Sequence, residues 1–249
     1  MHTINSKLEA EHSPEAIRDR LAIRTSVGYL GDAVLGAIDG CVTTFAVVAA
    51  AVGGGFSGNV ILVLGFANLI ADGFSMAVSN YLGTKSQRQE IENARATEHR
   101  HIEEIPEGER EEIRQIFAGK GFTGEVLEEI VTVITADRKL WVDTMVTEEL
   151  GMDGGNRSPR RAALATFVAF ICVGLLPLIP FLVPHLDHAT RFIASAVMTA
   201  FAFAAVGVTK GVLLQRSALR SGLETLITGG GAAALAYFVG AWLRRVYGA

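Results

Sequence analysis

Cysteine is scarce in this sequence, with two residues in 249, Cys41 and Cys172. Both lie in apolar runs, where a thiol behaves as a small hydrophobic group. Two isolated cysteines exclude a disulfide framework and a CxxC metal site. Aromatic residues make up only 8% of the chain although half of its residues are hydrophobic. The apolar content is therefore aliphatic and small, with 27 glycines, a composition that favours close helix–helix contact in lipid.

An excess of basic residues is also absent, since 22 Lys and Arg stand against 26 Asp and Glu. This acidic balance argues against nucleic-acid binding. The first 20 residues are polar and contain no apolar core, so we expect no cleavable signal peptide. Acidic residues are nearly missing from the C-terminal third, where Asp187 and Glu224 are the only two after residue 158.

Charge is instead concentrated in residues 85–158, which carry 17 of the acidic and 10 of the basic residues. The chain is thus apolar, then highly charged, then apolar again. This order predicts one aqueous domain inserted between membrane segments. We expect an N-terminal segment at 1–29, two membrane helices within 30–84, an acidic insert at 85–158 and further membrane helices within 159–249.

Five apolar stretches are long enough to cross a bilayer, which requires about 20 residues as a helix. They cover residues 30–52, 60–81, 162–183, 192–214 and 223–243. Backbone groups in lipid must bond to one another, which favours helices. The glycine-rich segment 53–58 is short enough to make the first two helices an antiparallel hairpin. The sequence therefore predicts an all-α polytopic membrane protein with five transmembrane helices.

The Lys and Arg residues near these helices predict their orientation. With five spans, most fall on one side: Arg18, Arg20, Arg24, Lys85, Arg88, Arg157, Arg160, Arg161, Lys210, Arg216 and Arg220. Arg244 and Arg245 fall on the other side, against the rule. We therefore expect the N-terminus and the insert to be cytoplasmic, and the short chain without a presequence favours a bacterial inner membrane.

The insert has the composition of three helices. Residues 84–105 are rich in Glu, Arg, Gln and Ala and extend the second membrane helix outward. Pro106 opens the next helix, with acidic residues in its first turns, where both belong. A third helix is expected from Thr123 to about Leu150, before a glycine-rich return to the membrane.

Carboxylates within the apolar stretches are the first functional candidates, because a charge in the hydrocarbon region is costly and is retained for function by default. Asp39 lies nine residues after Leu30, or about 13 Å along a helix, near mid-bilayer. Thr43 is one turn further on the same face. In the second span, Asn68, Asp72 and Met76 share one stripe at four-residue spacing.

Oxygen ligands combined with a thioether form a site of intermediate softness, which fits Fe(II) or Mn(II) better than Mg(II) or Na⁺. The alternative is structural. Asp39 and Asp72 then cap helices or pair with Lys210, and Met76 fills a gap in the core.

The insert contains a second set of candidates in three pairs at helical spacing: Glu98 with His101, Glu109 with Glu112, and Met145 with Glu149. Three short helices can bring such pairs together around metal ions. The alternative is that these residues form solvated helix surfaces, which are commonly rich in glutamate.

With these residues in view, the chain resembles the vacuolar iron transporter family, also called the yeast Ca²⁺-sensitive cross-complementer type. The resemblance extends over nearly the whole chain from Gly31. It is carried by the motifs at 31–40, 43–46, 67–76 and 81–82, by Pro106-x-x-Glu109-x-x-Glu112, and by 148–152. Together these motifs are specific, whereas each alone is weak.

The resemblance implies a five-helix fold and a homodimer with the pathway at its two-fold interface, carrying Fe²⁺ in exchange for protons. It implies that Asp39 and Met76 line the translocation path. The implied metal ligands of the cytoplasmic helices are Glu98, His101, Glu109, Glu112, Met145 and Glu149. Fe²⁺ is thus the expected transported and bound ion, with Mn²⁺, Co²⁺ and Zn²⁺ as alternatives.

Three positions depart from the family pattern. Plant and fungal members often carry glutamate where this chain has Asn68, and a small residue where it has Asp72. The carboxylate is thus displaced by one turn on the same face. His101 stands where glutamate is usual, and imidazole is also a ligand for Fe(II), Mn(II) or Zn(II).

Two other classes of function compete with transport. A membrane-tethered di-iron ferroxidase needs two Glu-x-x-His pairs and two further glutamates, and the insert has one such pair, Glu98 with His101. A metal sensor or scaffold would bind metal in the insert without moving it. Metal flux distinguishes a transporter from a sensor.

Overall fold

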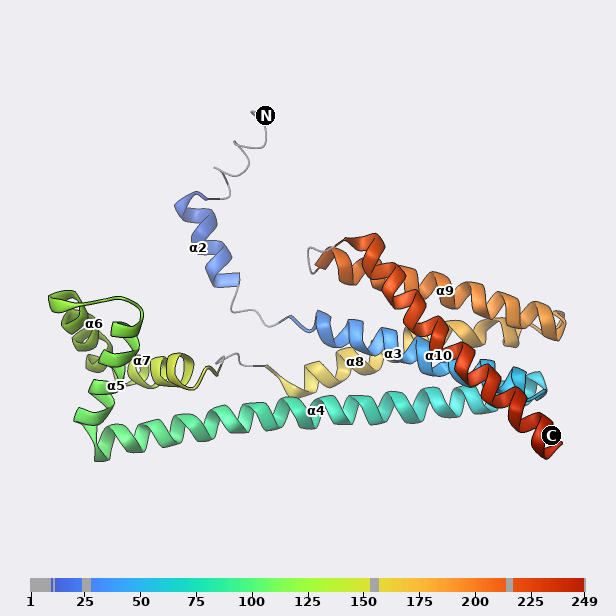
Figure 1. Cartoon of the computed structure of the whole chain (residues 1–249), viewed down its shortest axis with the longest axis horizontal. Coiled ribbons are helices and arrows are strands. Elements are labelled where there is room, and N and C mark those ends of the chain that lie inside the picture. Colours follow the sequence, from blue (N-terminus) through green and yellow to red (C-terminus); the bar gives the residue numbers. More distant parts are fainter. Residues whose placement is uncertain (1–9, 11, 24–27, 153–156, 214–216, 249) are drawn as a thin grey trace. The chain divides into compact units, whose positions relative to one another are not determined.

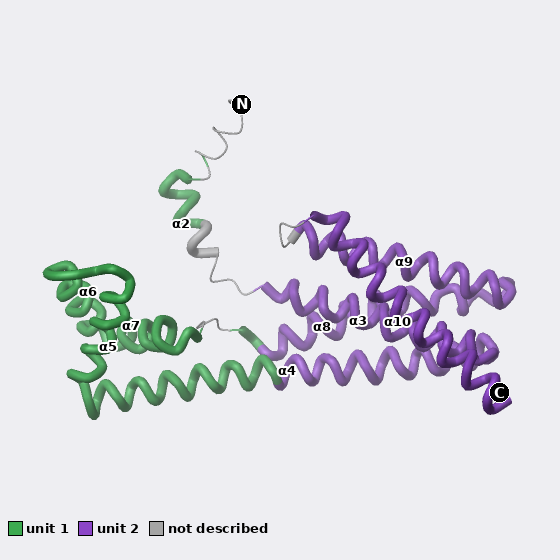
Figure 2. The backbone as a smooth tube through the Cα atoms, in the orientation of Figure 1, with its two compact units in different colours: residues 1–27, 83–158 green, residues 28–82, 159–249 purple. Residues whose placement is uncertain are grey.

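The computed structural model describes residues 10, 12–23, 28–152, 157–213 and 217–248. Within these ranges the secondary structure is helical and contains no strand. The chain divides into two compact units (Figure 2). Unit 1 comprises residues 1–27 and 83–158, and unit 2 comprises residues 28–82 and 159–249. The all-α prediction is confirmed.

Unit 2 contains the predicted membrane helices (Figure 1). They are α3 (Leu30–Gly53), the first part of α4 (Gly58–Glu104), α8 (Pro159–Gly174) with η2 (Leu176–Leu182), α9 (His188–Leu213) and α10 (Ala218–Tyr247). Five such segments are long and apolar enough to cross a membrane, so the prediction of five spans is confirmed. Helix α4 has 47 residues and continues without a break into unit 1, as its composition predicts.

The third span and the N-terminal segment differ from the prediction, and one predicted boundary is not tested. The third span is not one α-helix, because Pro177 and Pro180 have no backbone N–H to donate, and a 3₁₀ segment replaces its last turns. The predicted end of the fourth span, Leu214, lies outside the described residues. The N-terminal segment contains a helix, α2 (Pro14–Ile23), that the sequence analysis does not anticipate.

Helix α3 packs against α8, α9 and α10 within unit 2, and glycines permit the closest of these contacts. A Cβ atom on Gly40 would lie 2.4 Å from the carbonyl oxygen of Phe170 in α8. A Cβ on Gly240 of α10 would lie 2.1 Å from the carbonyl oxygen of Ala50. Both distances are far inside van der Waals contact. The absence of a side chain at these positions therefore sets the spacing between α3 and its neighbours.

We predict that Gly40→Ala destabilises unit 2, because the added methyl group forces α3 away from the backbone of α8. Overpacking of this kind costs about 1–3 kcal/mol, so the melting temperature in detergent should fall by several degrees. Gly230→Ala in α10 is the matched control, since, apart from its chain neighbours and the adjacent backbone of α10, no described atom lies within 4 Å of its Cβ position. Equal melting temperatures for the two variants would contradict this account of the packing.

Besides α2, unit 1 contains the C-terminal part of α4, α5 (Pro106–Gly119), α6 (Gly124–Ala136), α7 (Arg138–Thr144) and the π-helix η1 (Met145–Glu149). The predicted third helix, from Thr123 to about Leu150, is interrupted at Asp137, which has an extended backbone. Its carboxylate accepts hydrogen bonds from the backbone N–H groups of Lys139 and Leu140. Asp137 thereby ends α6 and caps α7.

Candidate metal centre

Three predicted ligands come together in unit 1: Glu98 and His101 of α4 with Glu109 of α5. One ligand atom from each lies within 4.8 Å of the other two. Only Ile105 separates α4 from α5, and Pro106 disfavours helical backbone at the residue before it. The chain therefore turns sharply at Ile105, and the first turns of α5 return to the last turns of α4.

The two carboxylates of this group are almost completely buried. Glu98 is 4% exposed and Glu109 is 5% exposed. Among the described residues, the Oε2 atom of each has no hydrogen-bond partner. His101 Nδ1 lies 3.4 Å from Glu109 Oε1. A buried, unpartnered carboxylate oxygen is energetically unfavourable, and a divalent cation between the side chains would satisfy it. Two carboxylates and an imidazole suit a transition-metal ion.

The electrostatics of Glu109 reflect this crowding. Its pKa is raised to about 7, first by burial and then by the charges of Glu112, Glu98 and Glu149. The pKa of Glu149 is also raised, first by burial and then by Glu112 and Glu98, with His101 acting in the opposite direction. Like charges from α4, α5 and η1 therefore converge here, which favours binding of a cation or a proton.

The other predicted ligands lie outside the compact group. Glu112 and Glu149 are exposed, but they are close enough to raise the pKa of Glu109. Met145 is fully buried in the hydrophobic cluster that contains Ile113 and Trp141. The structure thus places three of the six residues within ligand distance of one another and two more within electrostatic range. It places Met145 in the core, and metal ligation by any of the six stays a prediction.

We expect metal binding to this group to weaken as the pH falls. The raised pKa means that the folded, metal-free protein holds the Glu109 proton more tightly than the unfolded chain does. Protonation of Glu109 therefore stabilises the folded, metal-free protein. This stabilisation is complete below pH 4.5, the ordinary pKa of the side chain, and is lost as the pH rises through about 7. A bound metal must displace this proton below pH 7, so affinity should fall by up to about tenfold per pH unit.

Isothermal titration calorimetry with Mn²⁺ at pH 6.0 to 8.0, in buffers of different ionisation enthalpy, measures both the affinity and the protons released. The variant Glu109→Gln should bind more weakly and release fewer protons. Glu111→Gln is the control, because Glu111 is an exposed partner of Arg114 on the same helix. An affinity that does not change with pH would contradict the prediction.

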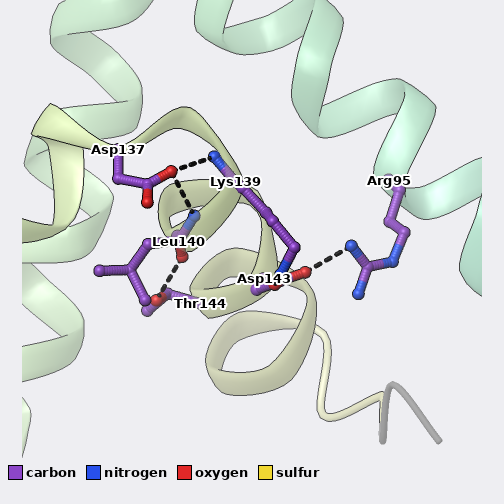
Figure 3. A network of polar contacts seen from close by, with 6 residues as sticks. All are labelled: Arg95, Asp137, Lys139, Leu140, Asp143 and Thr144. Atoms are coloured by element: carbon purple, nitrogen blue, oxygen red, sulfur yellow. Dashed lines mark hydrogen bonds and ion pairs between the residues drawn. The ribbon is translucent and has the colours of Figure 1, made fainter.

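A polar network that the sequence analysis missed links α4 to α7 within the same unit (Figure 3). Arg95 of α4 donates a hydrogen bond to Asp143 of α7, and Lys139 Nζ donates to the other oxygen of Asp143 at 2.7 Å. These bonds, that of Lys139 first, lower the pKa of Asp143. Arg95 and Asp143 are 48 residues apart in the sequence. No local spacing pattern could have revealed the pair.

In unit 2, Asp39 on α3 and Asp72 on α4 are both half-buried and close enough to repel each other electrostatically. The Asn68 side-chain nitrogen is buried and has no hydrogen-bond partner among the described residues. Thr43 Oγ1 donates to the carbonyl oxygen of Asp39 at 2.9 Å, so its proton bonds within its own helix. Met76 is partly buried and packs against the hydrophobic core of unit 2.

A second unanticipated network joins three helices of unit 2. Asn80 Nδ2 on α4 donates to Asp32 Oδ1 on α3 at 3.0 Å and to Thr166 Oγ1 on α8 at 2.7 Å. Asp32 and Thr166 are buried. Hydrogen bonds between helices are the expected use of such side chains in lipid. The network therefore ties α4 to α3 and α8 near one end of the apolar segments.

Comparison with known proteins adds a further observation. The model of the VIT family matches residues 30–241. The vacuolar iron transporter of Toxoplasma gondii is 32% identical over 236 residues, which cover 90% of this chain and 78% of that protein. Vacuolar iron transporter 1 of Arabidopsis thaliana is 31% identical over 210 residues, covering 83% of this chain and 82% of the relative. The vacuolar iron transporter of Plasmodium falciparum is 24% identical over 221 residues, covering 85% of this chain and 81% of that protein.

Proposed function

We propose, from the premise that this chain belongs to the VIT family, that it is a transporter of divalent transition-metal ions with Fe²⁺ as the favoured cargo. It is a multi-pass membrane protein with five helices of spanning length. The observation that carries the proposal is the pair of half-buried carboxylates, Asp39 and Asp72, on two apolar helices. Carboxylates at such positions are retained for an ion pathway.

Unit 1 supplies the capture step of the proposed mechanism. Its acidic residues raise the local concentration of cations, and Glu98, His101 and Glu109 bind the metal, with Glu112 and Glu149 supplying further charge. The nitrogen ligand of His101 favours Fe²⁺, Mn²⁺, Co²⁺ or Zn²⁺ over Mg²⁺. Support comes from the buried, unpartnered oxygens of Glu98 and Glu109 and from the names of the relatives, which are iron transporters.

Translocation in this proposal uses Asp39 and Met76, with Asp72, Asn68 and Thr43 in support, at the interface of a homodimer. A cation and a proton compete for the same carboxylates, and this competition couples metal export to proton entry. The Lys and Arg bias of the sequence supports a cytoplasmic N-terminus and insert. The protein accordingly exports metal from the cytoplasm across a cell inner membrane.

The ferroxidase alternative is not retained. VIT-family proteins are transporters rather than enzymes, and a di-iron ferroxidase needs a second Glu-x-x-His pair. Among the described residues, the single cluster of metal-binding type contains one histidine. A sensor would bind metal without flux, so the transport experiment distinguishes it from a transporter.

The decisive experiment is Fe²⁺ uptake into proteoliposomes that contain the purified full-length chain. An imposed pH gradient should drive uptake when the external side is alkaline and faces unit 1, and a proton ionophore should abolish the part of the uptake that depends on the gradient. Parallel assays with Mn²⁺, Co²⁺ and Zn²⁺ give the selectivity. Metal binding without any flux under either gradient would reject the transporter in favour of the sensor.

A further inference from the structure

The π-helix η1 carries two of the predicted ligands and comes directly after α7. Helix α7 is tied to α4 by two sets of polar contacts. Arg95 binds Asp143 near the end of α7, and Arg138 at its start binds Glu103 and donates to the carbonyl oxygen of His99 at 2.8 Å. The contacts at its two ends therefore fix α7 along the C-terminal part of α4.

The face of α4 that receives α7 also presents the metal group. Arg95, Glu98 and Ile102 are spaced three and four residues apart, so they lie along one side of the helix. Ile102 belongs to the same buried cluster as Trp141 and Val142 of α7. The Arg95–Asp143 pair thus lies one turn of α4 away from Glu98, on the side that α7 covers.

The geometry of η1 depends on where α7 ends. The backbone N–H of Leu150 donates to the carbonyl oxygen of Met145 at 3.3 Å, a bond one residue longer than in an α-helix. The extra residue rotates the end of the segment by about 100° relative to a regular α-helix, and such π-turns occur frequently at functional sites. Met145, the first residue of η1, is buried in the same cluster as Ile102 of α4 and Ile113 of α5, which places the start of η1 against both helices of the metal group. Glu149 also interacts electrostatically with Glu98 and His101, so its approach to them depends on a fixed starting point for η1.

We propose that the Arg95–Asp143 ion pair is a positioning contact that holds η1 in the register that brings Glu149 to the Glu98–His101–Glu109 group. Asp143 itself is saturated by Arg95 and Lys139 and does not bind the metal. It acts through the segment that begins two residues later. The inference rests on the proposed metal binding by unit 1, and it adds two residues that control affinity without contacting the ion.

The test measures Mn²⁺ affinity of the purified full-length chain by isothermal titration calorimetry. Loss of groups that orient metal ligands typically costs 10–100-fold in affinity, so Asp143→Ala should weaken binding by at least about tenfold. Lys139→Gln is the matched control, because Lys139 binds the same carboxylate from a position that is 83% exposed and does not connect α7 to α4. It should change affinity by less than about twofold.

Two further variants separate positioning from a general effect on folding. If Asp143 acts through Glu149, then Asp143→Ala should cause no additional loss in a Glu149→Gln background, whereas a folding defect would add to it. The charge exchange Arg95→Asp with Asp143→Arg should restore most of the affinity. Melting temperatures of the metal-free variants show whether each one is folded, and Asp143→Asn replaces Asp143→Ala if the latter is not.

The outcomes distinguish this inference from the proposed function. If Glu98→Gln weakens Mn²⁺ binding but Asp143→Ala and Asp143→Asn do not, the positioning role is wrong and the metal site stands. Additive losses for Asp143→Ala and Glu149→Gln also reject the positioning role. If Glu98→Gln leaves Mn²⁺ binding unchanged, the metal site is itself rejected.

Discussion

Asp39→Asn is expected to reduce the initial rate of Fe²⁺ uptake into proteoliposomes by roughly a hundredfold. The asparagine keeps the shape of the side chain but removes the negative charge that a cation meets within the apolar part of α3. By insertion scales, an uncompensated charge at the centre of a membrane helix costs about 3 kcal/mol, and a cation that passes without the carboxylate meets a cost of this order. Each 1.36 kcal/mol of barrier corresponds to about tenfold in rate. Metal binding by unit 1 should be unaffected, because Asp39 belongs to unit 2.

The control for this variant is Glu224→Gln. Glu224 is an exposed acid on α10 that pairs with Arg220 four residues away, and its loss should leave the rate within about twofold because exposed pairs contribute little. Asp72→Asn should give a rate between those of Asp39→Asn and the wild type. Asp72 is close enough to Asp39 for their charges to interact, so it adds to the negative charge that attracts the cation, but in our proposal it only supports Asp39. Wild-type flux by Asp39→Asn would remove this residue from the pathway and with it the proposed route.

The double variant Glu98→Gln with Glu109→Gln is expected to weaken Mn²⁺ binding by about a hundredfold or more. Loss of a group that only orients a ligand already costs 10–100-fold, and this variant removes two ligand charges. Calorimetry on the purified full-length chain provides the measurement. Stability should change in the opposite direction to metal affinity. Above pH 7, the melting temperature of the metal-free double variant should be no lower than that of the wild type.

This opposite effect on stability arises from the burial of the two carboxylates. Burial and neighbouring acids raise the pKa of Glu109 to about 7, so its ionised form destabilises the folded state at higher pH. Neutral glutamine relieves the repulsion while filling the same volume. Replacing residues that only support the fold would have a different effect, because it would lower both the metal affinity and the melting temperature. Glu128→Gln, which removes the exposed partner of Arg114, is the control for both measurements.

The two experiments examine separate units of the chain. Asp39 tests whether unit 2 conducts metal, and the glutamate pair tests whether unit 1 captures it. Loss of flux with intact binding is expected for the first variant. For the second, binding is lost and flux at low Fe²⁺ concentration falls, while flux at saturating Fe²⁺ should be largely kept. This last result would identify unit 1 as a collector rather than an obligatory part of the pathway.

Much of the fold can be predicted from local features of the sequence. Apolar segments of spanning length predict membrane helices because lipid leaves the backbone no other hydrogen-bond partners. The continuation of the second span into the insert is expected because no proline interrupts the residues between Tyr81 and Glu104. The break at Asp137 is not predicted, because an aspartate within a helical pattern is ambiguous until its side chain is seen to cap the next helix.

The candidate ligands could also be chosen from the sequence, since glutamates and histidine at helical spacing share a helix face. Their convergence could not be derived from it. The proximity of Glu98 and Glu109 depends on the turn at Ile105, and the register of Glu149 depends on the π-turn and, in our proposal, on the Arg95–Asp143 pair. The Asp32–Asn80–Thr166 network also joins residues far apart in sequence.

By itself, the sequence determined that this protein is helical, has five segments of membrane-spanning length and carries one acidic block between apolar segments, because hydropathy and charge act on each segment locally. Only the tertiary structure decided which acids are buried, which of them share a cation-sized space and which ion pair ties the last ligand-bearing turn to α4. Burial and distance arise from contacts between helices, and those contacts depend on packing against residues elsewhere in the chain.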